Sequence, residues 1–367
     1  MLPGNPAVSS RPPTVDLAAS VRSLPSLTGL RWIAALAVFA FHVRNANIVE
    51  GPLQDVLSRS FGVGAVGVSL FFVLSGFVLA WADRPGGSAR TFWWRRVARI
   101  YPLHVLTVLL AIVLGHTIAR GKIFADDPVA LLANLLLVNT WSVDWNQAGN
   151  LVSWTLGCEA FFYLLFPAIV PLVRAASPRA LRVALAGALL VVVALPLAAP
   201  AFPAWLDYHT SPIARLPEFV LGIVAARLTR TGAWRGPGVG LSLVLTGAGY
   251  ALARSVPVPV DLAACTIVGF VCLIPALALR DASGRGSWLA ARWSVWLGEV
   301  SFAFYLVHLL VIQVVGSAWP GGEPRLATAP GALLVLAVLG VCILAAWALH
   351  VGVERPAQRA LTARRVR

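Results

Sequence analysis

Ten apolar stretches dominate this chain of 367 residues, and each is long enough, or nearly long enough, to cross a lipid bilayer. A hydrocarbon core ~30 Å thick needs roughly 20 residues at about 1.5 Å of helical rise each. Because lipid offers a backbone no hydrogen-bond partners, every such stretch is expected to be an α-helix. The stretches are residues 26–43, 62–82, 100–119, 152–173, 183–200, 213–228, 238–253, 262–279, 294–318 and 330–353. The sequence therefore predicts an all-α, polytopic transmembrane helix bundle.

The low charge content agrees with a membrane bundle. Only 12% of the residues are charged and 59% are hydrophobic, whereas soluble domains carry about 25% charged residues. A further apolar piece, residues 128–141, is too short for a helical span, and we expect a re-entrant or interfacial segment there. The four cysteines lie in apolar runs without C-x-x-C spacing, so they are expected to be buried hydrophobic residues.

The basic residues predict the orientation of the bundle. The formal net charge is +14, and the basic residues of polytopic proteins collect in cytoplasmic loops beside anionic lipid. We therefore expect contacts with membrane lipid and no binding of nucleic acid. With the N-terminus inside and residues 128–141 not crossing, 21 arginines fall in cytoplasmic segments, against six basic residues outside. This bias predicts ten spans with both termini in the cytoplasm.

The predicted organisation is one membrane domain between two tails. Residues 1–25 are rich in proline and serine and contain no apolar signal segment, so we expect a disordered cytoplasmic tail. Residues 26–353 form the transmembrane domain. Residues 354–367 form a basic cytoplasmic tail.

Arg31 and His42 are two ionisable residues in the first apolar stretch, residues 26–43. Eleven residues separate them, which is about three helical turns, so both side chains leave the helix on nearly the same face, ~16 Å apart. Such a stripe suits a long reagent whose anionic head stays near the surface while its reactive end reaches inward. The alternative is that Arg31 reaches lipid phosphate and that His42 is a hydrogen-bonded interior histidine.

Arg96 and Arg99 follow the second span and are three residues apart. On a helix they form one face that suits bidentate binding of phosphate. The alternative is an ordinary cytoplasmic anchor, because Trp93 and Trp94 precede the pair as an aromatic belt would.

Glu159 and His308 are the next candidates, because an ionisable residue inside the membrane is by default a functional hypothesis. Glu159 lies about two helical turns into the fourth span from the outer side, and His308 lies near the middle of the ninth. By depth, both converge with His42. Glu218 has a comparable depth, but Arg215 one turn earlier gives it a structural partner, so Glu159 is preferred.

Several other chemistries lack their sequence signatures. Two histidines and a glutamate are possible zinc ligands, but no H-E-x-x-H motif or close histidine pair supports them, so no metal is expected. The absence of G-x-S-x-G, Walker and dinucleotide-binding motifs argues against serine hydrolases, ATPases and dinucleotide enzymes.

The order of several short motifs resembles the acyltransferase 3 family of membrane acyltransferases. The similarity runs from about residue 23 to residue 361 and rests on the number and order of the motifs rather than on any one of them. The motifs are R-x10-H at Arg31 and His42, GVSLFFVLSGFVLA, R-x-x-R followed by IYP, SWTLGCEAFFYLLFP, FVLGIVAARL, GEVSFAFYLVH and VERPAQRAL.

This resemblance implies an O-acyltransferase of the bacterial cell membrane. Its donor would be cytoplasmic acyl-CoA, such as acetyl-CoA or a short-chain homologue. Its acceptor would be a hydroxyl of a sugar, a glycolipid or a secondary metabolite such as a macrolide antibiotic. The sequence leaves the acyl chain length, the acceptor and the oligomeric state open.

The resemblance also gives the candidate residues roles. Arg31, Arg96 and Arg99 would bind the phosphates of the donor. His42 would be the general base that removes the acceptor proton. Glu159 would orient an imidazole or the acceptor, and His308 would assist proton transfer. Direct transfer is expected, because no activated serine or cysteine is evident.

Two other classes of function remain as alternatives. A transporter or flippase would use the intramembrane charges to bind a substrate or to relay protons. An inactive scaffold is disfavoured, because it gives no reason to keep Arg31 and His42 on one helix face.

Overall fold

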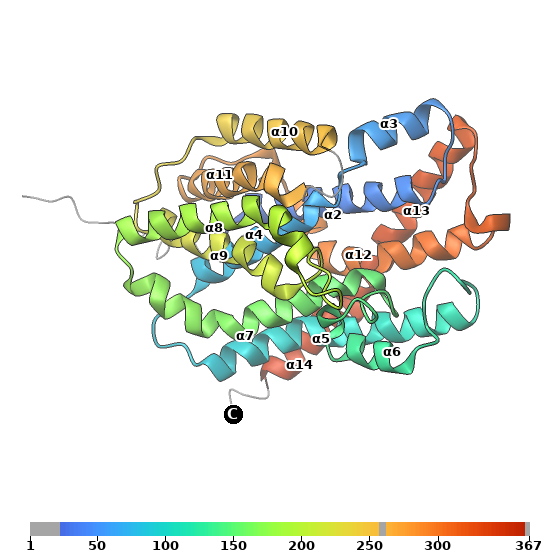
Figure 1. Ribbon diagram of the computed structural model, residues 1–367, viewed down its shortest axis with the longest axis horizontal. Helices are drawn as coiled ribbons and strands as arrows, with labels where there is room; N and C mark the ends of the chain where they lie inside the picture. Colours follow the sequence, from blue (N-terminus) through green and yellow to red (C-terminus); the bar gives the residue numbers. More distant parts are fainter. Residues whose placement is uncertain (1–22, 257–261, 364–367) are drawn as a thin grey trace, which may run out of the picture.

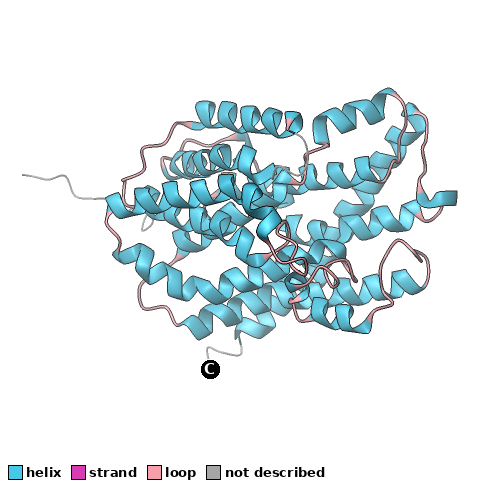
Figure 2. Cartoon of the chain, viewed as in Figure 1, coloured by secondary structure: helices cyan, strands magenta, loops and turns pink. Residues whose placement is uncertain are grey.

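The structure is a computed structural model that describes residues 23–256 and 262–363. Within these residues every regular element is a helix, apart from isolated bridges that join Val49 to Leu326 and Phe124 to Ala148 (Figures 1 and 2). The predicted all-α bundle is confirmed. The predicted N-terminal tail, residues 1–25, lies almost wholly outside the described residues, as do residues 364–367 of the predicted C-terminal tail.

Ten long helices build the described part of the bundle. Proline occupies the first turn of several elements, where its missing N–H costs nothing. The long helices are α2 (Pro25–Asn45), α4 (Val66–Ala82), α5 (Ala89–His116), α7 (Trp154–Ala175), α8 (Pro178–Ala198), α9 (Pro212–Arg230), α10 (Val239–Ser255), α11 (Leu262–Ala282), α12 (Arg292–Gly316) and α13 (Thr328–Leu349). The shorter elements are α3 (Pro52–Phe61), α6 (Pro128–Leu135), η1 (Asn139–Trp141), η2 (Leu151–Ser153), the π-helical η6 (His350–Glu354) and α14 (Arg355–Ala363).

Eight helical segments among the described residues are long and apolar enough to cross a membrane. They are Pro25–Asn45, Pro52–Ala82, Ala89–His116, Leu151–Ala175, Pro178–Ala201, Ala263–Ala282, Arg292–Gly316 and Thr328–Ala363. They correspond to eight of the ten predicted stretches. The other two, residues 213–228 and 238–253, form α9, which carries four charged side chains, and α10, which has only 17 residues. Ten spans and the cytoplasmic position of both termini therefore stay predictions.

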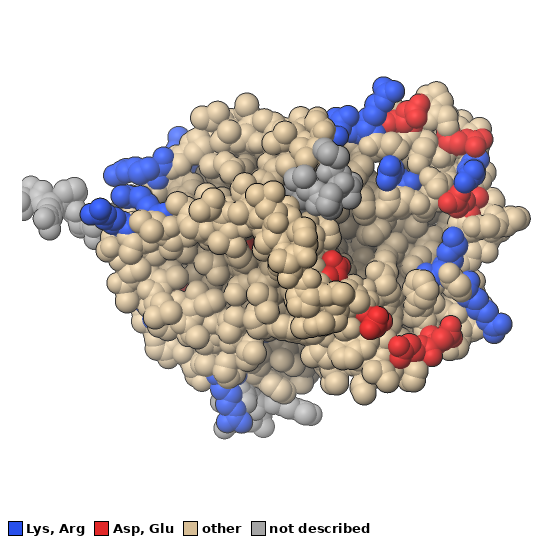
Figure 3. All heavy atoms as spheres, viewed as in Figure 1, with Lys and Arg blue, Asp and Glu red and all other residues tan. Residues whose placement is uncertain are grey.

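Charge is distributed unevenly along the bundle. On the face in Figure 3, basic side chains stand alone at the left end, where α8 begins, whereas toward the right acidic and basic side chains occur together. The end that the sequence assigns to the cytoplasm is thus the basic one. The sign of this difference agrees with the predicted orientation.

The connection between α5 and α7 folds back against the bundle. Helix α6 has eight residues, ~12 Å at 1.5 Å per residue, which is too short for a span. The buried Asn134 side chain donates to the Ala148 carbonyl at 2.5 Å, and the Asn150 side chain donates to the Leu306 carbonyl of α12 at 2.8 Å. Irregular backbone at membrane depth is tolerated where protein covers it, so this geometry suits the predicted re-entrant or interfacial segment.

The described part of the predicted C-terminal tail is helical and packs against the bundle. Helix α14 continues from α13 through η6 and returns alongside α5 (Figure 1). The Trp94 indole donates to the Leu361 carbonyl at 2.7 Å, and Arg355 lies 3.5 Å from Glu299 at the start of α12. These contacts place α14 beside the beginning of α5.

Helix α2 runs parallel to α12, and this pairing sets the level of the two predicted histidines. A Cβ atom on Gly298 would lie 1.9 Å from the Thr28 carbonyl oxygen, so the two backbones touch there. Farther along both helices, the Phe39 and His308 rings lie 6.4 Å apart. Residues about ten positions beyond the first contact therefore meet again, and His42 reaches the level of His308.

Helices α4 and α9 pack backbone against backbone through two glycines. A Cβ atom on Gly76 would lie 2.1 Å from the Phe219 carbonyl oxygen, and one on Gly222 would lie 2.0 Å from the Val73 carbonyl oxygen. Small residues at helix interfaces allow such approach inside a membrane. Because α4 lines the candidate site described below, this contact also holds one of its walls.

We predict that Gly76→Val destabilises the bundle by about 1–3 kcal/mol or more, because overpacking forces the two backbones apart. The measurement is the melting temperature and the monodisperse yield of purified protein in detergent. Gly187→Val on α8 is the matched control, since nothing lies within 4 Å of a Cβ atom at that position. Equal melting temperatures for the two variants would contradict the packing described here.

Candidate functional site

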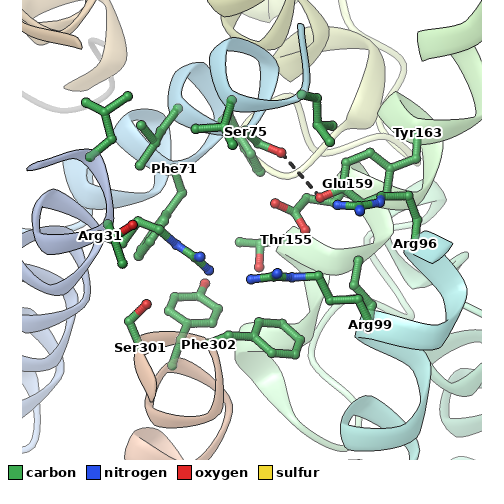
Figure 4. A pocket seen from close by; sticks show the side chains of 18 of the residues that line it. Arg31, Phe71, Ser75, Arg96, Arg99, Thr155, Glu159, Tyr163, Ser301 and Phe302 are labelled. Carbon is green, nitrogen blue, oxygen red and sulfur yellow. Dashed lines mark hydrogen bonds between the residues drawn. The ribbon is translucent and has the colours of Figure 1, made fainter. Parts of the chain in front are cut away.

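A cavity of about 360 Å³ lies inside the bundle between α2, α4, α5, α7 and α12 (Figure 4). We call it the arginine chamber. Its polar lining includes Arg31, Ser75, Arg96, Arg99, Thr155, Glu159, Tyr163, Ser301 and Tyr305. Four of the six predicted site residues therefore line one cavity, although they come from three helices.

The three arginines approach the chamber from two helices, α2 and α5. Arg31 lies in the second turn of α2 and points toward Arg99 across the cavity (Figure 4). Arg96 and Arg99 lie one turn apart on α5. The sequence placed these two in the loop before a span that starts at residue 100, but α5 already begins at Ala89, so both lie two to three turns inside the helix.

Glu159 lies with the arginines rather than with the histidines. Helices α5 and α7 run antiparallel: the Phe92 ring, early in α5, stacks on that of Phe166, late in α7, at 4.7 Å, whereas Arg99, farther along α5, shares the chamber with residues early in α7. Seven residues, about two turns, lead from Phe92 to Arg99, and seven lead back from Phe166 to Glu159. The two side chains therefore reach the same level. The sequence analysis expected Glu159 at the depth of the two histidines, whereas the structure places it in the chamber with the three arginines.

The chamber carries more positive than negative charge. Within the described residues, none of Arg31, Arg96 and Arg99 has a carboxylate within ion-pair distance. Glu159 is the acidic residue that lines the cavity, and its carboxylate lies next to the Tyr163 hydroxyl, which is 3.3 Å from the Ser75 hydroxyl (Figure 4). Unbalanced cations in a low-dielectric interior favour an anionic ligand.

His42 and His308 form a second group, and their ring centroids are 5.2 Å apart. The His308 ring is fully buried, and its Nδ1 lies 2.7 Å from the Tyr305 carbonyl oxygen. Because a carbonyl only accepts, Nδ1 carries the proton and Nε2 presents a lone pair. This Nε2 is buried and has no hydrogen-bond partner among the described residues.

Tyr305 stands between the chamber and the histidine pair. Its side chain lines the chamber, and its ring lies 5.7 Å from that of His308 and 5.9 Å from that of Phe71. The hydroxyl donates to the Val152 carbonyl at 3.3 Å. Arg31 and His42 thus share a helix face, as predicted, but an aromatic partition separates their surroundings.

The polar residues that the sequence analysis missed include two on α7. Thr155 and Tyr163 flank Glu159 at intervals of four residues, so all three lie on one face of α7. That spacing was the available signal, because polar side chains on one face of an apolar helix are expected to line a common space.

Two further predictions concerned metal binding and the role of Glu218. Among the described residues, no group of three or more His, Cys, Asp or Glu side chains is arranged to hold a metal ion. The Arg215 side chain donates to Glu218 at 2.7 Å, and both are buried. The structural role predicted for Glu218 is confirmed by this ion pair.

The fold and the site define a polytopic membrane protein with an internal, cationic ligand chamber. Residues 24–351 match the acyltransferase domain family, and the chain belongs to that family. The expectation drawn from the motif order is confirmed. The chain is therefore an O-acyltransferase.

Relatives at different distances share this domain. The chain is 43% identical to the acyltransferase MdmB of Streptomyces mycarofaciens over 363 residues, and this alignment covers 93% of each chain. It is 28% identical over 317 residues to the exopolysaccharide production protein ExoZ of Rhizobium meliloti, covering 83% of this chain and 93% of that one. The peptidoglycan O-acetyltransferase OatA of Listeria monocytogenes is 28% identical over 167 residues, which is 41% of this chain and 25% of OatA. No solved structure matches the chain.

We predict that a cysteine in the chamber reacts preferentially with anionic reagents. Ser75→Cys, in a background without the native cysteines, should react faster with an anionic than with a cationic methanethiosulfonate, relative to an exposed Thr117→Cys control. The reason is the unbalanced positive charge of the chamber. The measurement is the ratio of the two modification rates in neutral detergent, and a ratio equal to or below that of the control would contradict the charge assignment.

Proposed function

We propose that this chain transfers a short acyl group from acyl-CoA to a hydroxyl of a sugar, a glycolipid or a secondary metabolite such as a macrolide. The proposed setting is the bacterial cell membrane, crossed ten times with both termini in the cytoplasm. The observation that supports the donor is the chamber itself, where three guanidinium groups with no carboxylate partner among the described residues line a cavity beside the half-buried His42 and the buried His308.

Coenzyme A matches the spacing of these two groups. Its phosphates suit Arg31, Arg96 and Arg99, because guanidinium groups bind phosphate through paired hydrogen bonds. Its pantetheine arm carries the thioester away from the phosphates. Along α2, His42 lies ~16 Å beyond Arg31, which is a distance that a long flexible arm can span. The arm must pass Tyr305, so this side chain has to move before the reaction.

His42 is the proposed general base, because its ring is only half-buried whereas His308 is fully enclosed. In the proposed reaction His42 removes the proton of the acceptor hydroxyl, and the oxygen attacks the thioester carbonyl carbon. The tetrahedral intermediate collapses, the carbon–sulfur bond breaks, and the coenzyme A thiolate leaves and takes the proton from the imidazolium. The acyl group moves directly to the acceptor, with no acyl-enzyme.

His308 is proposed to assist by holding the tautomer of His42. Its Nδ1 proton is committed to backbone carbonyls, so its Nε2 is available to accept an N–H from the neighbouring imidazole. With one nitrogen of His42 occupied in this way, the other keeps its lone pair for the acceptor.

Glu159 is proposed to act on the donor side of the site. Its position in the arginine chamber favours balancing part of the positive charge and orienting the guanidinium groups. This role differs from the one the sequence favoured, which was to orient an imidazole or the acceptor.

The acceptor class follows the family and the relatives. One relative is named for peptidoglycan O-acetylation and another for exopolysaccharide production, and both names point to carbohydrate chemistry. The relative that covers 93% of each chain is named only as an acyltransferase. A carbohydrate hydroxyl or a sugar-bearing metabolite is therefore the proposed acceptor.

We predict that His42→Ala lowers the rate of acyl transfer by about 10²- to 10⁴-fold, because it removes the general base. The measurement is release of free coenzyme A thiol by purified protein supplied with acetyl-CoA and candidate acceptors. His209→Ala is the matched control, since this histidine is exposed in a loop. Near-normal turnover by His42→Ala, with donor binding retained, would reject the assignment.

The same assay separates the enzyme from a transporter. Thioester consumption in detergent, with no ion gradient present, supports acyl transfer. Gradient-dependent movement of a substrate in vesicles, without any acylated product, would contradict the proposed function and support the transporter.

A further inference from the structure

A second, larger cavity of about 680 Å³ adjoins the arginine chamber. We call it the vestibule. It lies between the loop of residues 83–88, the first two turns of α5 and the later half of α7. Leu79, Ala82 and Arg96 line both cavities, so the two are contiguous and Arg96 stands at their boundary.

The vestibule has its own positive charge. Its acidic residue, Asp83, is already engaged, because Arg174 donates to its carboxylate at 2.5 Å. Arg84, Arg95 and Arg96 also line the vestibule, and none of them has a carboxylate within ion-pair distance in the part of the chain that is described.

The loop that carries Arg84 is held in place at its start. Arg230 of α9 donates to the carbonyl oxygens of Ala80 and Asp83, both at 3.0 Å. Together with the Arg174–Asp83 ion pair, these bonds fix the end of α4 against α7 and α9. These contacts of Asp83 and Ala80 fix the backbone next to Arg84, although Arg84 itself lies in an exposed loop.

An apolar and aromatic wall faces these cations. Phe92 and Phe166 both line the vestibule, and their rings are stacked at 4.7 Å with an interplanar angle of 15°. The Arg96 guanidinium lies 5.8 Å from the centroid of the Phe92 ring, and Pro167 continues the apolar surface. Flat apolar surface beside several arginines suits a nucleotide, because a base packs on the wall while phosphates bind the guanidinium groups.

The volumes of the two cavities indicate that the donor would occupy both of them. The arginine chamber, at about 360 Å³, is near the lower end of the range of ~300–1,000 Å³ that holds drug-sized ligands. A donor with a phosphorylated nucleoside and a pantetheine arm is larger than that. Because the vestibule is contiguous with the chamber, the additional volume lies where the nucleotide end of such a donor would emerge.

We propose that the vestibule binds the adenosine 3′,5′-bisphosphate end of the donor, which rests on the proposed function. Arg84 and Arg95 bind the 3′-phosphate, and the base packs along Phe92 and Pro167. The pyrophosphate lies at Arg96 on the boundary, where it also reaches Arg31 and Arg99 of the chamber. The pantetheine arm then runs through the chamber toward Tyr305.

The test compares three ligands with the full-length protein in neutral detergent. Calorimetry measures coenzyme A, adenosine 3′,5′-bisphosphate, and 4′-phosphopantetheine, which lacks the nucleotide. In the double variant Arg84→Ala/Arg95→Ala, we expect coenzyme A to bind at least tenfold more weakly and the bisphosphate to lose measurable binding. The affinity for 4′-phosphopantetheine should stay within twofold of that of the native chain.

The matched control is Arg179→Ala/Arg182→Ala, which removes the same charge from an exposed part of α8. It should bind all three ligands like the native chain. Affinities are compared only between variants whose melting temperature equals that of the native chain. Because Arg84 and Arg95 are exposed, replacing them with alanine is expected to leave the fold intact.

Three results would overturn the assignment in distinguishable ways. Unchanged coenzyme A affinity in the vestibule variant would place the nucleotide elsewhere while leaving the donor proposal standing. A native chain that binds no coenzyme A would reject the donor itself. Binding to phosphatidylglycerol vesicles that depends on Arg84 and Arg95, without binding of the bisphosphate, would make the vestibule a site for anionic lipid.

Discussion

Positive charge held inside a membrane bundle is the constraint on which the site depends. Guanidinium groups are always protonated, and a low-dielectric interior makes each unpaired one expensive. Arg31, Arg96 and Arg99 nevertheless face one cavity in which, among the residues described, Glu159 is the single lining carboxylate. An anionic ligand that enters from one end of the bundle offsets this cost. The chamber therefore favours anionic ligands before any ligand is bound, and the arginines of the contiguous vestibule extend this positive charge.

Helix register decides which groups meet. The close contact of Gly298 with the Thr28 carbonyl keeps α2 and α12 parallel and in register, which brings His42 beside His308. The antiparallel pair α5 and α7 brings Glu159 level with Arg99 instead. The groups proposed to bind the donor and those proposed to transfer the proton therefore lie in two adjacent spaces. Tyr305 lines the first and contacts His308 in the second.

Much of the fold and part of the site followed from apolar length, charge bias and helical spacing. The all-α bundle and the shared face of Arg31 and His42 rest on periodicities that a sequence displays directly. For His42 and His308 the sequence predicted only a common depth, and the contact of their rings comes from the packing of α2 on α12. The position of Glu159 did not follow, because α5 begins about three turns before its apolar stretch and its arginines were assigned to a loop. The depth of a residue in the membrane also does not say toward which neighbouring helix its side chain points. The position of Tyr305 between the chamber and the histidines therefore could not be predicted from the sequence.

An electron cryo-microscopy structure with a non-hydrolysable thioether analogue of acetyl-CoA tests the central claim most directly. We expect density for the diphosphate within hydrogen-bonding distance of the guanidinium groups of the arginine chamber. We also expect that the Tyr305 ring is displaced and that the acyl end lies beside His42, as the proposed mechanism requires. Phosphates bound away from the arginines, or an acyl end that stays outside an unmoved aromatic partition, would contradict it.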